Sequence, residues 1–311
     1  MAAALTVPRA AFALDYPTRP VHLLVGYAAG GVNDIIARLT AQWLSRRLGQ
    51  QFVVEDRPGA GSNLATEQVV RAAPDGYTLL EASSSNGFNA ALYDKLSFDF
   101  IRDIAPVAST IRSYNVMEVT PSFPAKTVPD FIAYAKANPG KVNMASAGIG
   151  STPQLYGELF KSMAGVDLVT VHYRGSGAAL PDLIGGQCQV MFDSVVSSMA
   201  HIRSGALHAL AVTSATRVDA FPDLPAIAEF VPGYEGTGWQ GIGAPRNTPA
   251  EIVTALNEAI NAGLADADFK ARVDELGADV LPGSPSDFGR LIADYTEKWG
   301  KVIRAAGIKA E

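Results

Sequence analysis

The sequence predicts an α/β protein of two lobes, and three observations carry that prediction. At about 100–200 residues per domain, 311 residues correspond to two domains or to one large α/β domain. Short apolar runs alternate with longer segments at helical spacing, a pattern typical of mostly parallel sheets flanked by helices. The last 60 residues contain helices but no long strand, so we expect them to return to the first lobe. The predicted lobes are therefore residues 16–112 with 238–311, and residues 113–237.

The first lobe is predicted from a β–α–β–α–β pattern. Strands are expected over residues 21–25, 52–55 and 77–82, each short, apolar and followed by turn residues. Apolar positions at helical spacing predict helices over residues 34–48, where Gly49 ends the pattern, and 62–73. Residues 83–87 are predicted to form a polar loop.

The second lobe shows the same alternation. We expect helices over residues 128–138, 153–163, 178–185 and 197–204, and strands near residues 143–146, 168–172, 189–192 and 207–213. A stretch rich in proline and glycine follows from residue 221 to 249. Two amphipathic helices, residues 249–276 and 285–306, close the chain. The chain then crosses between the lobes near residues 110–118 and 235–245, and two such segments form a hinge around a ligand cleft.

Composition excludes several classes of protein. Hydrophobic residues make up 48% of the chain and charged residues 18%, enough to bury a core. The net charge of −6 argues against a nucleic-acid partner. A single cysteine, Cys188, excludes an intramolecular disulfide and Cys-cluster metal sites, and no motif predicts another metal or a cofactor. Residues 1–15 end in a small-x-small pattern, which predicts a residual export signal.

Two glycine-rich loops predict an anion site. In residues 26–34, small residues after a strand lead into a helix, whose free N–H groups and dipole favour a negative charge. The spacing is neither that of a dinucleotide-binding loop nor that of a P-loop. Residues 147–153 repeat the arrangement with the hydroxyls of Ser151 and Thr152. Arg174 is the cation predicted at a strand end facing the cleft, and Asp193 ends another strand, where it is expected to orient the backbone or Arg174.

Six short motifs, in order along the chain, resemble the Bug (TctC) family of periplasmic solute-binding proteins. They are residues 16–21 (YPTRPV), 29–34 (AGGVND), 55–61 (EDRPGAG), 73–79 (APDGYTL), 157–160 (GELF) and 173–176 (YRGS). The resemblance implies a type II-like binding-protein fold, a periplasmic location and no enzymatic activity or cofactor. It also implies a small organic acid as ligand, most often a dicarboxylate, and the membrane subunits of a tripartite tricarboxylate transporter as partners. We expect a monomer.

The resemblance also indicates which residues contact the ligand. These are Tyr27, Ala28, Ala29, Gly30, Gly31, Asn33, Ser84, Ser85, Gly148, Ser151, Thr152, Tyr173, Arg174, Gly175 and Asp193. Tyr27 and Arg174 stand where many relatives have a proline–phenylalanine pair and a lysine, so the ligand itself stays open.

Two alternatives remain at this stage. One is a ligand-sensing partner of a membrane sensor kinase, which the sequence does not separate from a transport receptor. The other is a periplasmic hydrolase that uses Ser176 or Ser151 with His172 or His201.

Overall fold

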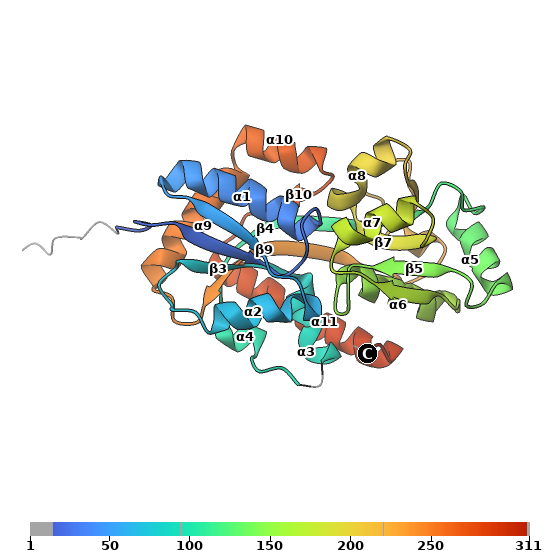
Figure 1. Ribbon diagram of the computed structural model, residues 1–311, viewed down its shortest axis with the longest axis horizontal. Helices are drawn as coiled ribbons and strands as arrows, with labels where there is room; N and C mark the ends of the chain where they lie inside the picture. Colours follow the sequence, from blue (N-terminus) through green and yellow to red (C-terminus); the bar gives the residue numbers. More distant parts are fainter. Residues whose placement is uncertain (1–14, 94, 220, 310–311) are drawn as a thin grey trace, which may run out of the picture.

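Helices flank a curved, mixed sheet in the computed structural model, which describes residues 15–93, 95–219 and 221–309 (Figure 1). The strand order is β2-β1-β3-β9-β4-β7-β5-β6, with β8 and β10 paired to β4. The predicted α/β class is confirmed. The predicted export signal lies outside the described residues, apart from Asp15. Among the described residues, no helix combines the length and apolar character needed to cross a membrane.

The first strand group contains β1 (Val21–Val25), flanked in parallel by β2 (Phe52–Asp56) and β3 (Thr78–Ser83). The connections carry α1 (Val32–Leu48), a short 3-10 turn (Ala60–Ser62) and α2 (Asn63–Val70). The polar loop predicted at residues 83–87 is wrong, because these residues begin helix α3 (Ser84–Leu92). The backbone N–H of Ser83 donates to Asn86 Oδ1 at 2.9 Å, so the polar run is a helix start and not a turn.

The second strand group contains β5 (Asn143–Ser146), which lies parallel to β6 (Val169–His172) and β7 (Val190–Ser194). Four helices surround it: α5 (Val128–Ala137), α6 (Thr152–Ala164), α7 (Ser176–Ile184) and α8 (Val195–Arg203). Strand β8 (His208–Val212) and a 3-10 turn (Ile227–Glu229) complete this part. These helices and strands agree with the sequence pattern.

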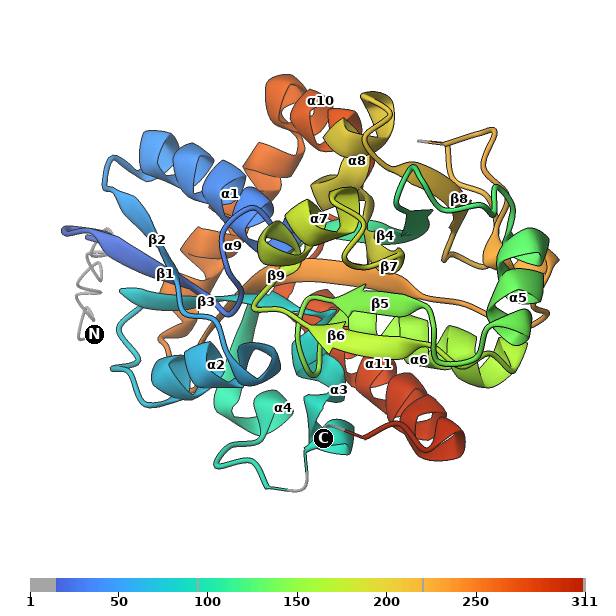
Figure 2. The ribbon, with the colours of Figure 1, turned by 45° about the vertical axis from the view of Figure 1, so that its right-hand side comes forward.

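Two long strands connect the groups (Figure 2). After a short helix α4 (Phe100–Asp103), β4 (Ile104–Val119) pairs first with β9 (Thr237–Pro245) and then with β7 and β8. All of these pairings are antiparallel, so the sheet is parallel only in its outer parts. The sequence pattern predicted that the chain crosses between the lobes at these two segments, but it did not identify β4 and β9 as strands. Strand β9 is difficult to identify from the sequence because it contains several glycines, which are rare in strands. Packing requires glycine at Gly241, because a Cβ there would lie 2.4 Å from the ring of Phe288.

The C-terminal helices pack on the first strand group. The predicted helix over residues 249–276 is interrupted, giving α9 (Ala250–Leu264) and α10 (Ala267–Glu275). The cause is Asp266, whose side chain accepts hydrogen bonds from the N–H groups of Asp268 and Phe269 and so starts a new helix. A two-residue strand, β10 (Asp279–Val280), precedes α11 (Pro285–Ala306).

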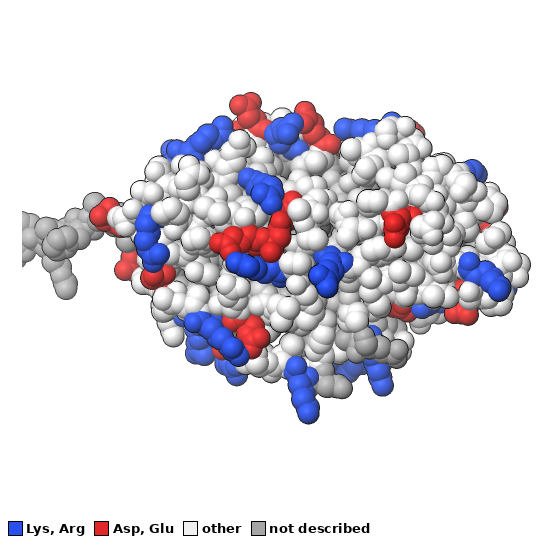
Figure 3. Space-filling model, in the orientation of Figure 1, with Lys and Arg blue, Asp and Glu red and all other residues white. Residues whose placement is uncertain are grey.

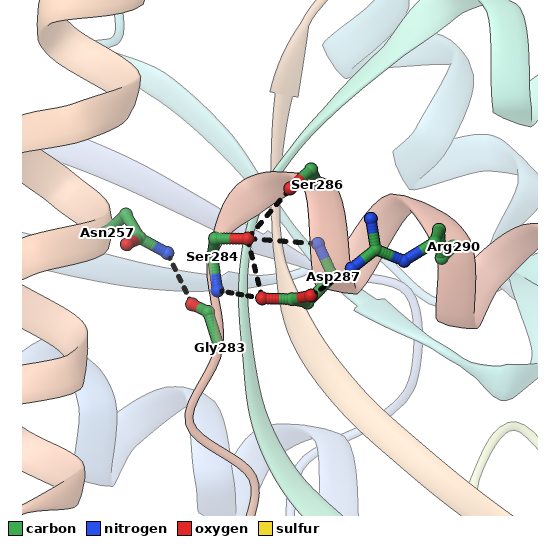
Figure 4. Close-up of polar contacts among 6 residues, drawn as sticks. All are labelled: Asn257, Gly283, Ser284, Ser286, Asp287 and Arg290. Carbon is green, nitrogen blue, oxygen red and sulfur yellow. Dashed lines mark hydrogen bonds and ion pairs between the residues drawn. The ribbon is translucent and has the colours of Figure 1, made fainter.

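Helix α11 is fixed at its start by a polar cluster (Figure 4). Asn257 of α9 donates through Nδ2 to the carbonyl of Gly283 at 2.9 Å. Ser284 caps the helix, since its Oγ accepts from the N–H of Asp287 at 3.1 Å while Asp287 Oδ2 accepts from the N–H of Ser284 at 2.9 Å. Arg290 pairs with Asp287 one turn further along.

The far end of α11 reaches the second strand group. The ring of Trp299 lies 5.2 Å from that of Tyr156 in α6, and the hydroxyls of Tyr156 and Tyr295 are 3.0 Å apart. Tyr156 also donates to the carbonyl of Thr237 at 2.7 Å. Helix α11 is therefore a third connection between the two groups, beside β4 and β9.

Candidate functional site

The carboxyl ends of the parallel strands in both groups face each other across a small closed cavity. This inner cavity has a volume of about 20 Å³. Residues at the starts of five helices line it: Asn33 (α1), Ser85 (α3), Thr152 (α6), Ser176 (α7) and Ser194 (the residue before α8). Each helix start brings unpaired N–H groups and the positive end of a dipole. The cavity is therefore built to hold a negative charge without a buried cation.

A second hollow continues from the first. This outer cavity has a volume of about 400 Å³ and shares Tyr27 and Ala147 with the inner cavity. Its walls are mostly apolar and glycine-rich, with Tyr93 and Ile149 on one side and the exposed Arg174 at its edge. Together the two cavities offer a polar end, an apolar middle and a cationic rim.

The structure brings most of the predicted site residues to these two cavities. The inner cavity is lined by Tyr27, Gly31, Asn33, Ser85, Ser151, Thr152 and Asp193, and the outer cavity by Tyr27, Gly148, Tyr173 and Arg174. Ala28, Ala29, Gly30, Ser84 and Gly175 line neither.

The residues outside the cavities hold neighbouring segments together. The N–H of Ala28 donates to the carbonyl of Arg174 at 2.9 Å, which joins residues 27–31 to residues 174–177. Ser84 Oγ accepts from the N–H of Trp239 at 2.7 Å and so fixes β9.

Two predicted residues that line the cavities have partners of their own. The phenol of Tyr173 donates to Asp182 at 2.7 Å. Of the two expected partners of Asp193, the structure shows the backbone and not Arg174: Asp193 accepts from the N–H of Ser194 and from Ser176 Oγ, the latter at 2.6 Å.

Three buried carboxyl groups lie at or behind the wall of the inner cavity. Asp193, which the sequence singled out, lines the cavity, and Glu81 and Glu118 do not line it. Glu81 accepts from Asn33 Nδ2 at 2.7 Å, and Glu118 accepts from Ser198 Oγ at 2.7 Å. Burial raises the pKa of Glu81 and of Glu118 well above the usual value. Burial also raises the pKa of Asp193, to about 6. Near the cavity, acidic side chains thus carry less charge than the sequence suggests.

Several buried polar atoms at the inner cavity have no hydrogen-bond partner among the described residues. They include the hydroxyls of Tyr27 and Ser194 and Oε1 of Gln240. Tyr27 is 6% exposed and its phenol faces Ser85 without hydrogen-bonding geometry. Burial raises the pKa of this phenol, so it remains a neutral donor. Because buried polar groups are normally satisfied, these atoms are available to bond to a ligand or to water.

Ser83, Ser194 and Gln240 also line the inner cavity, and sequence reasoning missed them. Ser194 follows Asp193 at the end of β7, so the rule that ligands bind at strand ends could have found it. Gln240 lies on β9, which was not recognised as a strand, and no local signal marks it.

Within the part of the chain that the structure describes, neither serine of the hydrolase alternative is hydrogen-bonded to His172 or His201. Ser176 donates to Asp193, and Ser151 donates to the carbonyl of Gly148 at 2.6 Å. His172 Nδ1 lies 2.8 Å from Oγ of Ser146, which is fully buried. Among the described residues, no group of three or more histidine, cysteine and acidic side chains is arranged to hold a metal ion.

A larger hollow between α1, α8 and α10 has a volume of about 1190 Å³ and is an open surface groove. Its walls are the outer faces of helices, with exposed arginines such as Arg46 and Arg203. Strand ends do not converge on this groove, so we place the candidate site at the inner and outer cavities.

Residues 36–308 match the family model described as the tripartite tricarboxylate transporter family receptor, TctC. The chain belongs to this family. TctC proteins are periplasmic solute-binding receptors, a class of protein that binds substrates and is distinct from enzymes. The family resemblance seen in the sequence motifs is confirmed.

Relatives of this TctC protein agree across almost the whole chain. Protein BugT of Bordetella pertussis is 34% identical over 297 residues, 94% of this chain and 91% of BugT. Among solved structures, R. palustris Rpa4515 with adipate is 38% identical with a TM-score of 0.92, over 95% of this chain and 99% of that one. MatC of Rhodopseudomonas palustris with bound malate is 32% identical with a TM-score of 0.89, over 93% of this chain and all of that one.

Proposed function

We propose that this protein is a periplasmic receptor that captures a small organic dicarboxylate and delivers it, as a monomer, to a tripartite tricarboxylate-type membrane transporter. The observation that carries the proposal is the inner cavity, where five helix starts and unpartnered neutral donors converge. Adipate and malate in the related structures are both dicarboxylates, which supports this ligand class.

In this proposal the two cavities divide the ligand between them. One carboxylate lies in the inner cavity, held by helix N-termini and by Tyr27 and Ser194. The carbon chain lies against the apolar walls of the outer cavity, and the second carboxylate reaches Arg174 at its rim. Arginine donates two parallel hydrogen bonds to a carboxylate, which suits this end of the ligand.

Closure follows from the position of the cavities between two lobes. We propose that residues 16–112 with 238–311 form one lobe, that residues 113–237 form the other, and that β4 and β9 act as the hinge. The volume of the inner cavity exceeds the roughly 10–15 Å³ that one water needs, but a chain of several carbons requires the walls to part. A ligand that contacts both lobes favours the closed form.

A ligand screen tests the function directly. Purified protein is heated with C4–C8 dicarboxylates, citrate and aromatic acids, and affinities are then measured by calorimetry. At a hundredfold excess over Kd, a true ligand stabilises the protein by about 2.7 kcal/mol. A screen in which no carboxylate raises the melting temperature contradicts the proposal.

A pair of tyrosine variants then tests the site. Tyr27→Phe removes a buried hydroxyl with no partner, so we expect higher stability but weaker dicarboxylate binding. Tyr234→Phe is the matched control, because the hydroxyl of Tyr234 is buried and donates to the carbonyl of Tyr156 at 3.0 Å. This control should lower stability and leave affinity unchanged. Equal affinity of Tyr27→Phe and wild type contradicts the proposed position of the carboxylate.

A further inference from the structure

Two carboxyl groups lie side by side behind the inner cavity. Asp193 of β7 lines the cavity and is 1% exposed, and Glu118 of the neighbouring strand β4 is fully buried. Ser198 Oγ links them, because it donates to Glu118 Oε1 at 2.7 Å and lies 3.4 Å from Asp193 Oδ2. Glu118 Oε2 has no hydrogen-bond partner among the described residues.

No cation balances this pair within the described residues. Neither carboxyl forms an ion pair there with a lysine, arginine or histidine. The groups that bond to Asp193 are neutral: Ser176 of α7, Ser198 of α8 and the backbone N–H of Ser194. Glu118 faces it from β4, and Tyr27 lies on the wall of the same cavity. Burying two carboxylates without a cation is costly, so the pair favours holding protons.

The two members hold their protons differently. Burial, and then the charge of Asp193, raise the pKa of Glu118 well above its usual value, so its protonated form is favoured. Burial raises the pKa of Asp193 only to about 6, since hydrogen bonds from Ser176, Ser194 and Ser198 stabilise its charged form. Without ligand, Asp193 therefore carries a negative charge above about pH 6.

We propose that binding of a dicarboxylate dianion is coupled to uptake of one proton by Asp193, which makes this residue a determinant of the ligand charge that the site accepts. The inference rests on the proposed function. A ligand carboxylate in the same small cavity would repel ionised Asp193, and like charges at close range raise the pKa further. The proton comes from solvent on binding and returns to solvent on release. Protonated Asp193 then adds an O–H donor to the cavity.

The first test is the pH dependence of affinity in the wild type. Simple carboxyl groups ionise near pH 4, so adipate and malate are dianions throughout the range from pH 6.5 to 8.5. Over that range, uptake of one proton makes Kd rise by up to about tenfold per pH unit, because the folded protein must first recover the proton. Below about pH 6 the proton is already bound, so the affinity levels off. A Kd that stays constant from pH 6.5 to 8.5 overturns the inference.

Two isosteric variants assign the proton. Asp193→Asn is neutral at every pH, so its Kd should lose the pH dependence between pH 6.5 and 8.5. Glu118→Gln is the matched control, because its amide mimics the protonated acid that burial favours, and the pH dependence should persist. If the Kd of Asp193→Asn depends on pH as steeply as that of the wild type, the assignment of the proton to Asp193 is overturned.

A measurement on wild-type protein alone guards against a variant that does not fold. Calorimetry at pH 7.5 in phosphate and in Tris gives apparent enthalpies that differ in proportion to the protons taken up. We expect uptake approaching one proton per ligand, and equal enthalpies overturn the inference. Binding without proton uptake leaves the proposed receptor function standing, whereas absence of any dicarboxylate binding across the pH range removes both.

Discussion

Gly177→Ala tests whether the loops on either side of the cavities separate when no ligand is bound. Gly177 has a helical backbone in α7, where alanine is normally favoured by up to about 1 kcal/mol. A Cβ at this position, however, would lie 2.0 Å from the carbonyl oxygen of Ala29 in the opposite loop. Residues 27–31 and 174–177 therefore cannot keep their observed contact in the variant.

The magnitude follows from that distance. Backbone atoms cannot yield as a flexible side chain does, so the two loops must move apart by about 1 Å, and overpacking of this kind costs about 1–3 kcal/mol. If the cost falls on the ligand-bound closed form alone, Kd rises about 5–150-fold. In the proposed closure the ligand-free protein is open and avoids the clash, so its melting temperature should equal or slightly exceed that of wild type.

The assay is calorimetric titration with adipate together with thermal unfolding of the ligand-free variant. Gly289→Ala in α11 is the control, since its Cβ would lie at an ordinary 3.4 Å from Pro106 Cγ and far from the cavities. Wild-type affinity in Gly177→Ala would refute the reasoning, because the contact would then play no part in binding. A marked fall in the melting temperature without ligand would refute it as well, since the loops would be permanently packed together.

Three further predictions concern other residues. Glu81→Gln should raise the free energy of unfolding more at pH 8 than at pH 5 in urea titrations. The reason is that folding raises the pKa of Glu81. The wild-type protein therefore has its full stability below the pKa of Glu81 in the unfolded state, and it loses stability as the pH rises towards the pKa in the folded state. Arg174→Ala should raise Kd for dicarboxylates about tenfold, close to 1.4 kcal/mol, and leave monocarboxylates unaffected in the same titration. Tyr156→Phe should lower the free energy of unfolding by about 1 kcal/mol, because its hydroxyl joins Thr237 and α6.

The sequence predicted the parts of the fold that depend on local pattern. Each β–α unit carries its own signal, an apolar run, a glycine-rich turn and a periodic helix, so most elements and the positions of both glycine-rich loops were predictable. Strand β9 was not, because Gly238, Gly241 and Gly243 read as loop while the packing of neighbours demands glycine there. Helix α3 was missed because its first residues, from Ser84 to Gly87, have the composition of a turn.

The sequence predicted the parts of the candidate site that are formed by backbone groups of glycine-rich loops. It did not predict the side chains whose role depends on being buried. A glycine-rich strand end before a helix is visible in one sequence, and it located Gly31, Asn33 and Ser151 at the inner cavity. Glu81 and Glu118 give no such signal, since an acidic residue usually lies on a solvated face. Only the three-dimensional arrangement shows that β3 and β4 carry these two carboxyls into the interior.

The acidic composition is compatible with the proposed anionic ligand through this arrangement. Figure 3 shows lysines and arginines interspersed with acidic side chains on one face of the molecule, so long-range attraction of an anion is weak there. Recognition then depends on short-range donors, which come from helices of both proposed lobes: α1 and α3 on one side, α6, α7 and α8 on the other. Neither side alone encloses a carboxylate. In the proposed function, a dicarboxylate therefore has a differential affinity for the closed form, which is the condition for a ligand to shift a conformational equilibrium. A buried lysine on one side would weaken that dependence, because it would bind the anion in the open form as well.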